Sequence, residues 1–216
     1  MSERNLSQRK KFARELGLAP IHADLLAGLN TPHKIQDYLD SLDINFEPQG
    51  DTCHGVARTL REGKAHCIEG AFVAACALWI AGEKPLVMDF QADRDSDHVV
   101  ALYKYKGHWG AISKSNHIWL RWRDPVYRSL RELALSYFHE YVTRERKTLR
   151  AYSVAYDLSR LAPEYWVTNE ESCFEVAGTI DAARHYQLVP KSHLKMIRPR
   201  DRMEVKADGI VEFSPR

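Results

Sequence analysis

A cysteine and a histidine stand at the starts of two predicted elements. Cys67 opens an apolar run that ends at Ala81, and His98 opens the run Val-Val-Ala-Leu-Tyr-Lys that ends at Tyr105. The first run is apolar on nearly every side, which predicts a buried helix over residues 66–81. The second run predicts a strand. A thiol in the first turn of a helix and an imidazole on a neighbouring strand are the parts of a thiolate nucleophile.

The position of the thiol has a chemical consequence. The thiolate attacks carbon, and an ordinary cysteine is mostly protonated near neutral pH. Backbone N–H groups at a helix N-terminus favour negative charge, and a nearby imidazole can take the proton and hold it as a cation. The same N–H groups can donate hydrogen bonds to an oxyanion on the substrate. We therefore interpret Cys67 as a nucleophile and His98 as its general base.

A hairpin must position the histidine. His98–Tyr105 and His108–Ser115 predict two strands joined at Lys106-Gly107. With a two-residue turn, Ser113 lies diagonal to His98 on the same face of the sheet. This parity predicts Ser113 as the third polar residue, in contact with the imidazole.

Three other residues stay open as partners of the histidine. Ser115 would face His98 directly, and Asn116 would need a bulge in the return strand. Asp124 is a further candidate if a third strand over Ile118–Trp122 folds back beside the hairpin.

These motifs together resemble the transglutaminase-like superfamily, in an uncharacterised bacterial branch. The resemblance covers about residues 51–124 and is carried by three segments: Gly63-Lys-Ala-His-Cys67, Asp97-His98-Val-Val-Ala-Leu-Tyr103 and Gly107-His-Trp109-Gly-Ala-Ile-Ser113. Arg123-Asp-Pro-Val-Tyr-Arg-Ser-Leu-Arg-Glu132 is similar to the segment that follows in those bacterial members.

The resemblance implies a Cys-His-Asp triad that performs acyl transfer, by amide hydrolysis, ester hydrolysis or transamidation. Cys67 matches the nucleophile and His98 the base, whereas Ser113 occupies the place of the acid. A hydroxyl stabilises an imidazolium less than a carboxylate does, so any activity is expected to be slow and Ser113→Asp to raise it. The alternative is a catalytically degenerate scaffold that binds a peptide or protein partner.

The implied fold is a single α+β domain of papain-like, transglutaminase-like type over residues 1–216. Its core spans about 51–124, with a helical N-terminal extension (1–50) and a C-terminal extension (125–216). In that core the helix bearing the cysteine packs on an antiparallel sheet.

Outside the core, the pattern predicts six further elements. They are helices over 3–16, 20–29, Val126–Val142 and Ser172–His185, a helix that opens at Thr31-Pro32, and a hairpin over Met203–Phe213 that turns at Asp208-Gly209.

The amino-acid composition limits the classes of binding partner to expect. The 216 residues include 31 Lys and Arg against 29 Asp and Glu, a net charge of +2, which gives no reason to expect nucleic acid or a membrane as partner. We expect a peptide or amide substrate; the oligomeric state stays open. No secretory signal is visible, and four cysteines are too few for a disulfide scaffold, so a cytoplasmic setting is expected.

Two patterns in the sequence resemble sets of metal ligands, but neither has the spacing that a metal site needs. Adjacent Cys-His pairs at 53–54 and 66–67 could suggest zinc, but neighbouring residues rarely point at one ion. The alternating acids Asp93, Asp95 and Asp97 lack the glycine and distal glutamate of a calcium loop. We therefore expect no metal and no cofactor.

Overall fold

The computed structural model describes residues 4–213, in which a seven-stranded antiparallel sheet carries helices on both faces. The strand order is β11-β9-β3-β4-β5-β6, and β10 also pairs with β3. The strands of this sheet are β3 (Leu86–Ala92), β4 (His98–Tyr105), β5 (His108–Ile112), β6 (Arg123–Tyr127), β9 (Leu149–Ser153), β10 (Tyr156–Asp157) and β11 (His185–Gln187).

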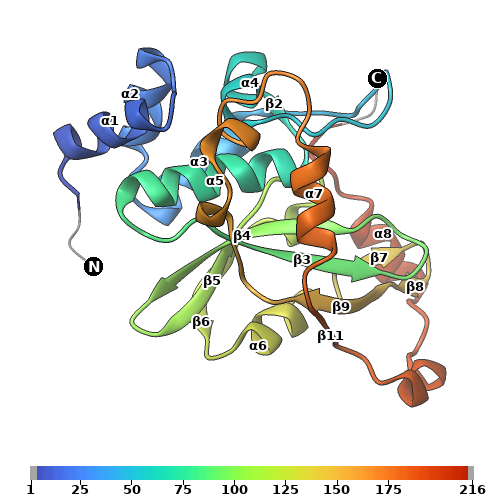
Figure 1. The fold of residues 1–216 in the computed structure, drawn as a ribbon. Helices are drawn as coiled ribbons and strands as arrows, with labels where there is room; N and C mark the ends of the chain where they lie inside the picture. Colours follow the sequence, from blue (N-terminus) through green and yellow to red (C-terminus); the bar gives the residue numbers. More distant parts are fainter. Residues whose placement is uncertain (1–3, 214–216) are drawn as a thin grey trace.

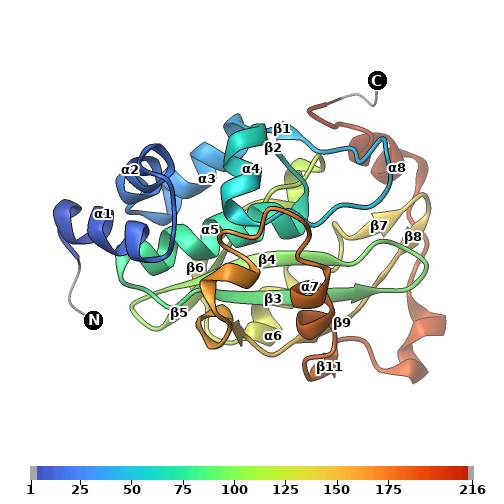
Figure 2. The ribbon, with the colours of Figure 1, turned by 45° about the horizontal axis from the view of Figure 1, so that its top comes forward.

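Helices α1 to α5 lie over one face of the sheet, and α6 lies against the other (Figures 1 and 2). The helices are α1 (Leu6–Glu15), α2 (Pro20–Gly28), α3 (Pro32–Ser41), α4 (Val56–Glu62), α5 (Cys67–Ala81), α6 (Leu130–Leu135), α7 (Phe174–Asp181) and α8 (Arg202–Asp208). Short strand pairs complete the chain: β1 (Asp43–Ile44) with β2 (Lys64–Ala65), and β7 (Val142–Thr143) with β8 (Arg146–Lys147). Within residues 4–213, no helix is both long and apolar enough to cross a membrane.

Helix α5 is the central helix that the sequence predicts. Every residue of α5 except Cys67, Trp79 and Ala81 is buried. The helix ends because Gly82 adopts a left-handed conformation, with φ of 112°, and its N–H caps the last turn. One side of α5 packs on β4, and the others pack on the N-terminal helices. The predicted packing of the cysteine-bearing helix on an antiparallel sheet is therefore confirmed.

The hairpin β4–β5 also has the predicted register. Lys106 and Gly107 both have positive φ, 46° and 86°, as a tight hairpin turn of matching twist requires. Tyr105 pairs with His108, and the ladder continues to the pair Ala101 and Ile112. The return strand is shorter than predicted because its pairing ends at Ile112, just before the third site residue.

Two apolar cores lie on the two faces of the sheet, and β4 contributes alternately to each. Val99, Ala101 and Tyr103 pack with α5 and the N-terminal helices. Val100 and Leu102 pack with α6 and the tyrosines that follow it. Because both faces are covered, β4 is apolar at every position from 99 to 103, and its first residue is held at the end of a rigid strand.

The predictions of a third strand over Ile118–Trp122 and of a long helix over Val126–Val142 are wrong. Residues Ile118–Leu120 form a 3-10 turn, and the strand beside β5 is β6. Where a helix over Val126–Val142 was predicted, only α6 forms, started by the Ser129 side chain accepting from the N–H of Glu132. The buried tyrosines beyond α6 produced the helical spacing, but they are placed by successive turns instead.

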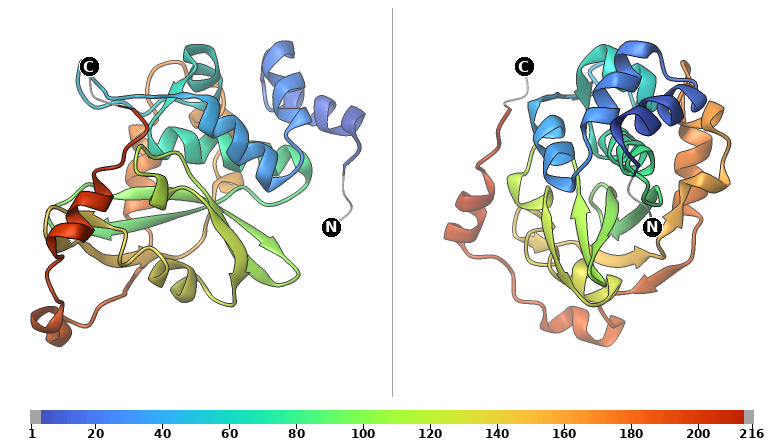
Figure 3. Two further views of the ribbon diagram at one scale, coloured as in Figure 1. Left: turned by 180° about the vertical axis from the view of Figure 1, so that it is seen from behind. Right: turned by 90° about the vertical axis from the view of Figure 1, so that its left-hand side faces the viewer.

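At the C-terminal end, the predicted hairpin over Met203–Phe213 is wrong: its first part, to Asp208, is helical, and Val211 forms an isolated bridge with His117. Asp201 caps α8 by accepting from the N–H groups of Met203 and Glu204. Asp208-Gly209 ends that helix rather than turning a hairpin. Figure 3 shows α8 at the end of the sheet opposite the N-terminal helices. The predicted helices near the N-terminus and over Ser172–His185 are present as α1, α2 and α7, and residue 3 of the predicted range lies outside the described residues.

Gly70 is where α5 approaches the end of β5 most closely. A Cβ there would lie 2.6 Å from the Cβ of Lys114. We expect Gly70→Ala to lower the free energy of unfolding by about 1–3 kcal/mol, since a well-packed core does not admit an extra methyl without shifts. Gly178 in α7 is the matched control, because a Cβ there meets nothing within 4 Å. Gly178→Ala should be neutral or stabilising by up to about 1 kcal/mol. Urea unfolding measures the stability of both variants. Equal effects would contradict the close approach of Gly70 to Lys114.

Candidate active site

A cleft of about 280 Å³ lies at the N-terminal end of α5, where the beginning of β4 and the end of β5 meet it. Cys67 and His98 both line this cleft, together with residues of the loops that surround the end of the sheet. The lining residues are Ile44, His66, Cys67, Asp95, Ser96, Asp97, His98, Lys114, Ser115, Asn116, His117, Leu120, Glu140, Tyr141 and Val142. The two predicted reactive side chains thus open into one space.

Cys67 is the one partly exposed thiol among the described residues; Cys53, Cys76 and Cys173 are buried. Burial raises the pKa of each of those three thiols. At Cys67, burial also acts to raise the pKa, but hydrogen bonds and positive charge from His66 and His98 outweigh it and lower the pKa to about 5. A thiol with this pKa is ionised at neutral pH.

His98 is held by the residue that the hairpin parity predicts. The Ser113 hydroxyl lies 2.8 Å from Nε2 of His98, and both side chains are buried. The ring of Tyr141 packs edge-on at 6.3 Å between centroids, which fixes the plane of the imidazole. Because Ser113 engages Nε2, Nδ1 is the ring nitrogen available for proton transfer. The predicted contact between Ser113 and His98 is present, and its catalytic role stays a prediction.

Gln36 of α3 positions Ser113, and sequence reasoning missed it. Its side-chain Nε2 donates to the Ser113 carbonyl at 3.0 Å, and its Oε1 accepts from the Ser113 N–H at 3.1 Å. The amide therefore replaces a neighbouring strand just beyond the end of the β5 ladder. A glutamine on the buried face of α3, beside Ile35 and Leu39, was the available signal.

The three alternative partners of His98 are occupied elsewhere. The Ser115 hydroxyl accepts from the N–H of His117, and Asp124 accepts from the indole of Trp122. Asn116 holds the C-terminal segment: its side chain donates to the Phe213 carbonyl at 2.8 Å and accepts from the Phe213 N–H at 2.9 Å. None of these polar contacts reaches the imidazole.

Behind Cys67 lies a buried carboxylate, Glu69, whose side chain is fully inaccessible. One oxygen accepts from the N–H of His54 at 3.0 Å and from the Thr52 hydroxyl at 3.1 Å. The other accepts from the N–H of His66 and the amide of Asn45, both at 3.1 Å. Glu69 is the third residue of α5, so these contacts join the start of the helix to the loop over residues 45–54.

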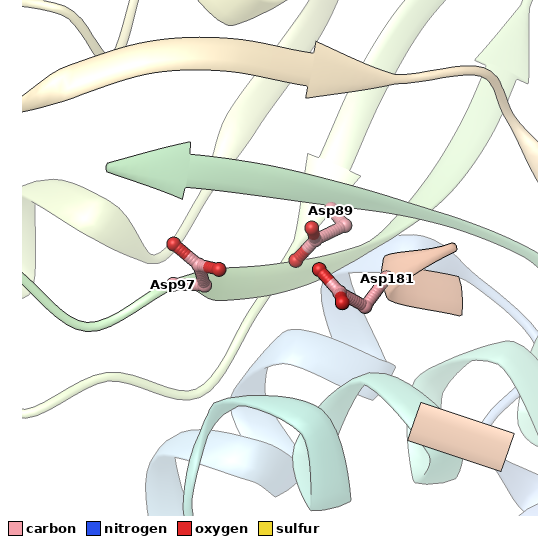
Figure 4. A group of neighbouring side chains, drawn as sticks. All are labelled: Asp89, Asp97 and Asp181. Atoms are coloured by element: carbon pink, nitrogen blue, oxygen red, sulfur yellow. The ribbon is translucent and has the colours of Figure 1, made fainter. Parts of the chain in front are cut away.

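A second group of acids gathers beside the sheet and shares Asp97 with the cleft wall. Figure 4 shows Asp89 of β3, Asp97 and Asp181 of α7 pointing toward one another, with oxygens within 4.8 Å. Burial, with the charges of the other two, raises the pKa of Asp89 to about 6, against the opposing effect of His185 at 3.0 Å. The three carboxylates repel one another, and His185 partly offsets this repulsion at Asp89.

The alternating acids of the loop do not gather as a loop that binds a cation would. Asp93 pairs with Arg146 at 2.9 Å, and Asp95 accepts from the Thr148 hydroxyl at 2.6 Å. Asp97 instead accepts from the N–H of Ala92. Each carboxylate thus has a separate structural partner.

The Ser113 hydroxyl should contribute measurably to the reactivity of the site. We expect Ser113→Ala to slow acylation of Cys67 by an activated acyl ester by about tenfold, since a neutral hydrogen bond is worth roughly 1–1.5 kcal/mol. Ser113→Asp should accelerate the same step, because a carboxylate stabilises the imidazolium more strongly. Stopped-flow acylation rates at neutral pH measure both variants. An unchanged rate in Ser113→Ala would contradict a catalytic contribution from the Ser113 hydroxyl.

Comparisons with known proteins found only remote structural similarity. No protein-family model matches it, and no curated protein matches it. Two solved structures, Legionella pneumophila LapG and the same protein treated with EGTA, match with a TM-score of 0.36 and 12% identity. Each match covers 52% of this chain, and 74% and 72% of those chains respectively. A similarity this remote assigns neither a family nor a role to any residue.

Proposed function

We propose that the chain is a transglutaminase-like cysteine enzyme that transfers an acyl group from an amide or peptide to water or to an amine. The observation that carries the proposal is the partly exposed Cys67 thiol at the start of α5, ionised by two imidazoles in a shared cleft. The proposed substrate is a peptide or another amide, and the proposed setting is the cytoplasm.

The first half-reaction would form a thioester. The Cys67 thiolate attacks the substrate carbonyl carbon, and the backbone N–H groups of the first turn of α5 face the developing oxyanion, since a helix does not use them in its own ladder. As the carbon–nitrogen bond breaks, the His98 imidazolium gives its proton to the leaving amine.

The second half-reaction would restore the site. Neutral His98 takes a proton from water while the oxygen attacks the thioester carbonyl. The carbon–sulfur bond then breaks, so that a carboxylic acid leaves and the thiolate and imidazolium reform. An amine in place of water gives transamidation. Ser113 keeps the ring oriented in both halves through its hydrogen bond to Nε2.

The second candidate is a scaffold that has lost catalysis and binds a peptide or a protein partner in the same cleft. The observation that favours it is the hydroxyl of Ser113 in the place where the resemblance expects a carboxylate. A site of this kind would retain the cleft and the thiol without transferring an acyl group.

Trapping of an acyl adduct separates the two candidates. The protein is mixed with a p-nitrophenyl acyl ester, and the adduct is located by mass spectrometry of intact protein and peptides. The enzyme should carry one acyl group on Cys67, with the buried Cys76 unmodified as internal control. Cys67→Ala should carry none, and His98→Ala should acylate more slowly. A wild-type protein without an adduct on Cys67 would leave the scaffold as the better account.

A further inference from the structure

His66, the residue before Cys67, also contacts the thiol. Its Nδ1 lies 3.9 Å from Sγ of Cys67. Its Nε2 lies 3.0 Å from the Thr52 carbonyl oxygen, which can only accept, so Nε2 carries a hydrogen. Nδ1 is therefore the nitrogen that gains or loses the second proton, and it is the one that faces the sulfur.

Two carboxylates stand behind this ring. Nε2 of His66 lies 3.5 Å from an oxygen of Glu47 and 3.5 Å from an oxygen of Glu69. Glu47 is fixed in turn, because one of its oxygens accepts from the N–H of Thr52 at 2.6 Å. Opposite charges at this distance favour the charged form of an imidazole. Burial lowers the pKa of His66, but the hydrogen bond and charge of the Cys67 thiolate, with smaller contributions from Glu69 and Glu47, outweigh it and raise the pKa to about 9.

The contrast with His98 is chemical. The hydrogen-bond partner of His98 is the Ser113 hydroxyl, which bears no charge. The carboxylates that would stabilise an imidazolium are placed behind the neighbouring ring instead. His66 thus has two carboxylates beside it, whereas the hydrogen-bond partner of His98 is uncharged.

We propose that His66 is a second catalytic imidazole, which remains protonated between Glu47 and Glu69 and holds the Cys67 thiolate while His98 moves the proton. In the reaction steps above, His66 then neither donates nor accepts a proton, and the balance of atoms is unchanged. The proposal rests on the proposed function for its catalytic meaning, but the ionisation of Cys67 can be measured with no substrate present.

The test compares three variants by the pH at which Cys67 ionises. Ultraviolet absorbance of the thiolate gives this midpoint, with Cys67→Ala as the blank. His66→Gln can still donate to the Thr52 carbonyl but has no charge, and its midpoint should rise by at least about one pH unit, a tenfold loss of thiolate on the rising limb. His66→Lys restores a cation and should lower the midpoint again. His98→Gln should keep an ionised thiol at neutral pH while losing acyl transfer.

Glu47→Gln serves where a His66 variant does not fold. Its amide oxygen can still accept from Thr52, and only the charge behind His66 is removed, so the midpoint should move up by a smaller amount. An unchanged midpoint in His66→Gln, or in Glu47→Gln if it is the only folded variant, would overturn the proposal. Failure of the proposed function gives a different result, because acyl transfer would then be absent while the midpoint still depends on His66.

Discussion

Iodoacetamide should alkylate Cys67 faster than a small-molecule thiol at pH 6 and more slowly at pH 9. With a pKa of about 5, Cys67 is mostly thiolate at pH 6, whereas an ordinary thiol of pKa ~8.5 is roughly 0.3% ionised. The roughly 300-fold advantage in thiolate is reduced about 30- to 60-fold by the lower nucleophilicity of a less basic sulfur. A net advantage of about five- to tenfold at pH 6 remains.

The shape of the pH profile is the sharper part of this expectation. The alkylation rate of Cys67 should be flat from about pH 6 to 9 and should fall with a midpoint near pH 5, because acid protonates the thiolate. Peptide mapping assigns the rate to Cys67, since Cys53, Cys76 and Cys173 are buried and have raised pKa values. A rate that climbs steadily up to pH 9 would mean an ordinary thiol, and the thiolate account would be lost.

Glu69→Gln should be the most destabilising conservative change near the site. Each oxygen of Glu69 accepts at least two hydrogen bonds, so the amide nitrogen of a glutamine would face donors in either orientation. We expect a loss of about 3–5 kcal/mol in the free energy of unfolding, the range for removing one member of a buried charged network. For a chain of this size, that corresponds to a melting temperature lower by roughly 6–20 °C.

Glu170→Gln is the matched control for this change. Glu170 pairs with Arg61 at 2.7 Å, but both side chains are more than half exposed, and solvent screens such a pair so that it contributes little to stability. Differential scanning calorimetry of the two variants separates the effects. Similar melting temperatures would show that Glu69 does not hold the loop over residues 45–54 to α5.

The elements that carry Cys67 and His98 could be predicted because local patterns specify them. The apolar run after Cys67 fixes a buried helix, and Lys106-Gly107 fixes a two-residue turn whose parity brings Ser113 to His98. These features depend on residues close together in the chain. The same reasoning failed over Val126–Val142, where buried tyrosines at helical spacing are placed by turns after a short helix.

The supporting residues could not be predicted, because their partners are distant in the chain. Gln36 contacts Ser113 across 77 residues. Glu69 lies in the first turn of the predicted helix, and that position indicated only a favourable interaction with the helix dipole. In the structure, Glu69 also accepts hydrogen bonds from the loop over residues 45–54. For His66 the sequence offered only a zinc interpretation, which was rejected, whereas in the structure its Nε2 lies 3.5 Å from the carboxylates of Glu47 and Glu69. Periodicity reports which face of an element is buried, and does not report which loop closes over it.

Turnover of an acyl substrate tests the central claim most directly. The wild-type protein is given a large excess of p-nitrophenyl acyl ester and then a peptide amide, and the amount of leaving group released per protein molecule is measured. The account predicts many turnovers through an acylated Cys67, abolished in Cys67→Ala and strongly reduced in His98→Ala. Release of one equivalent or none by the wild-type protein, with Cys67 left unacylated or permanently acylated, would contradict it.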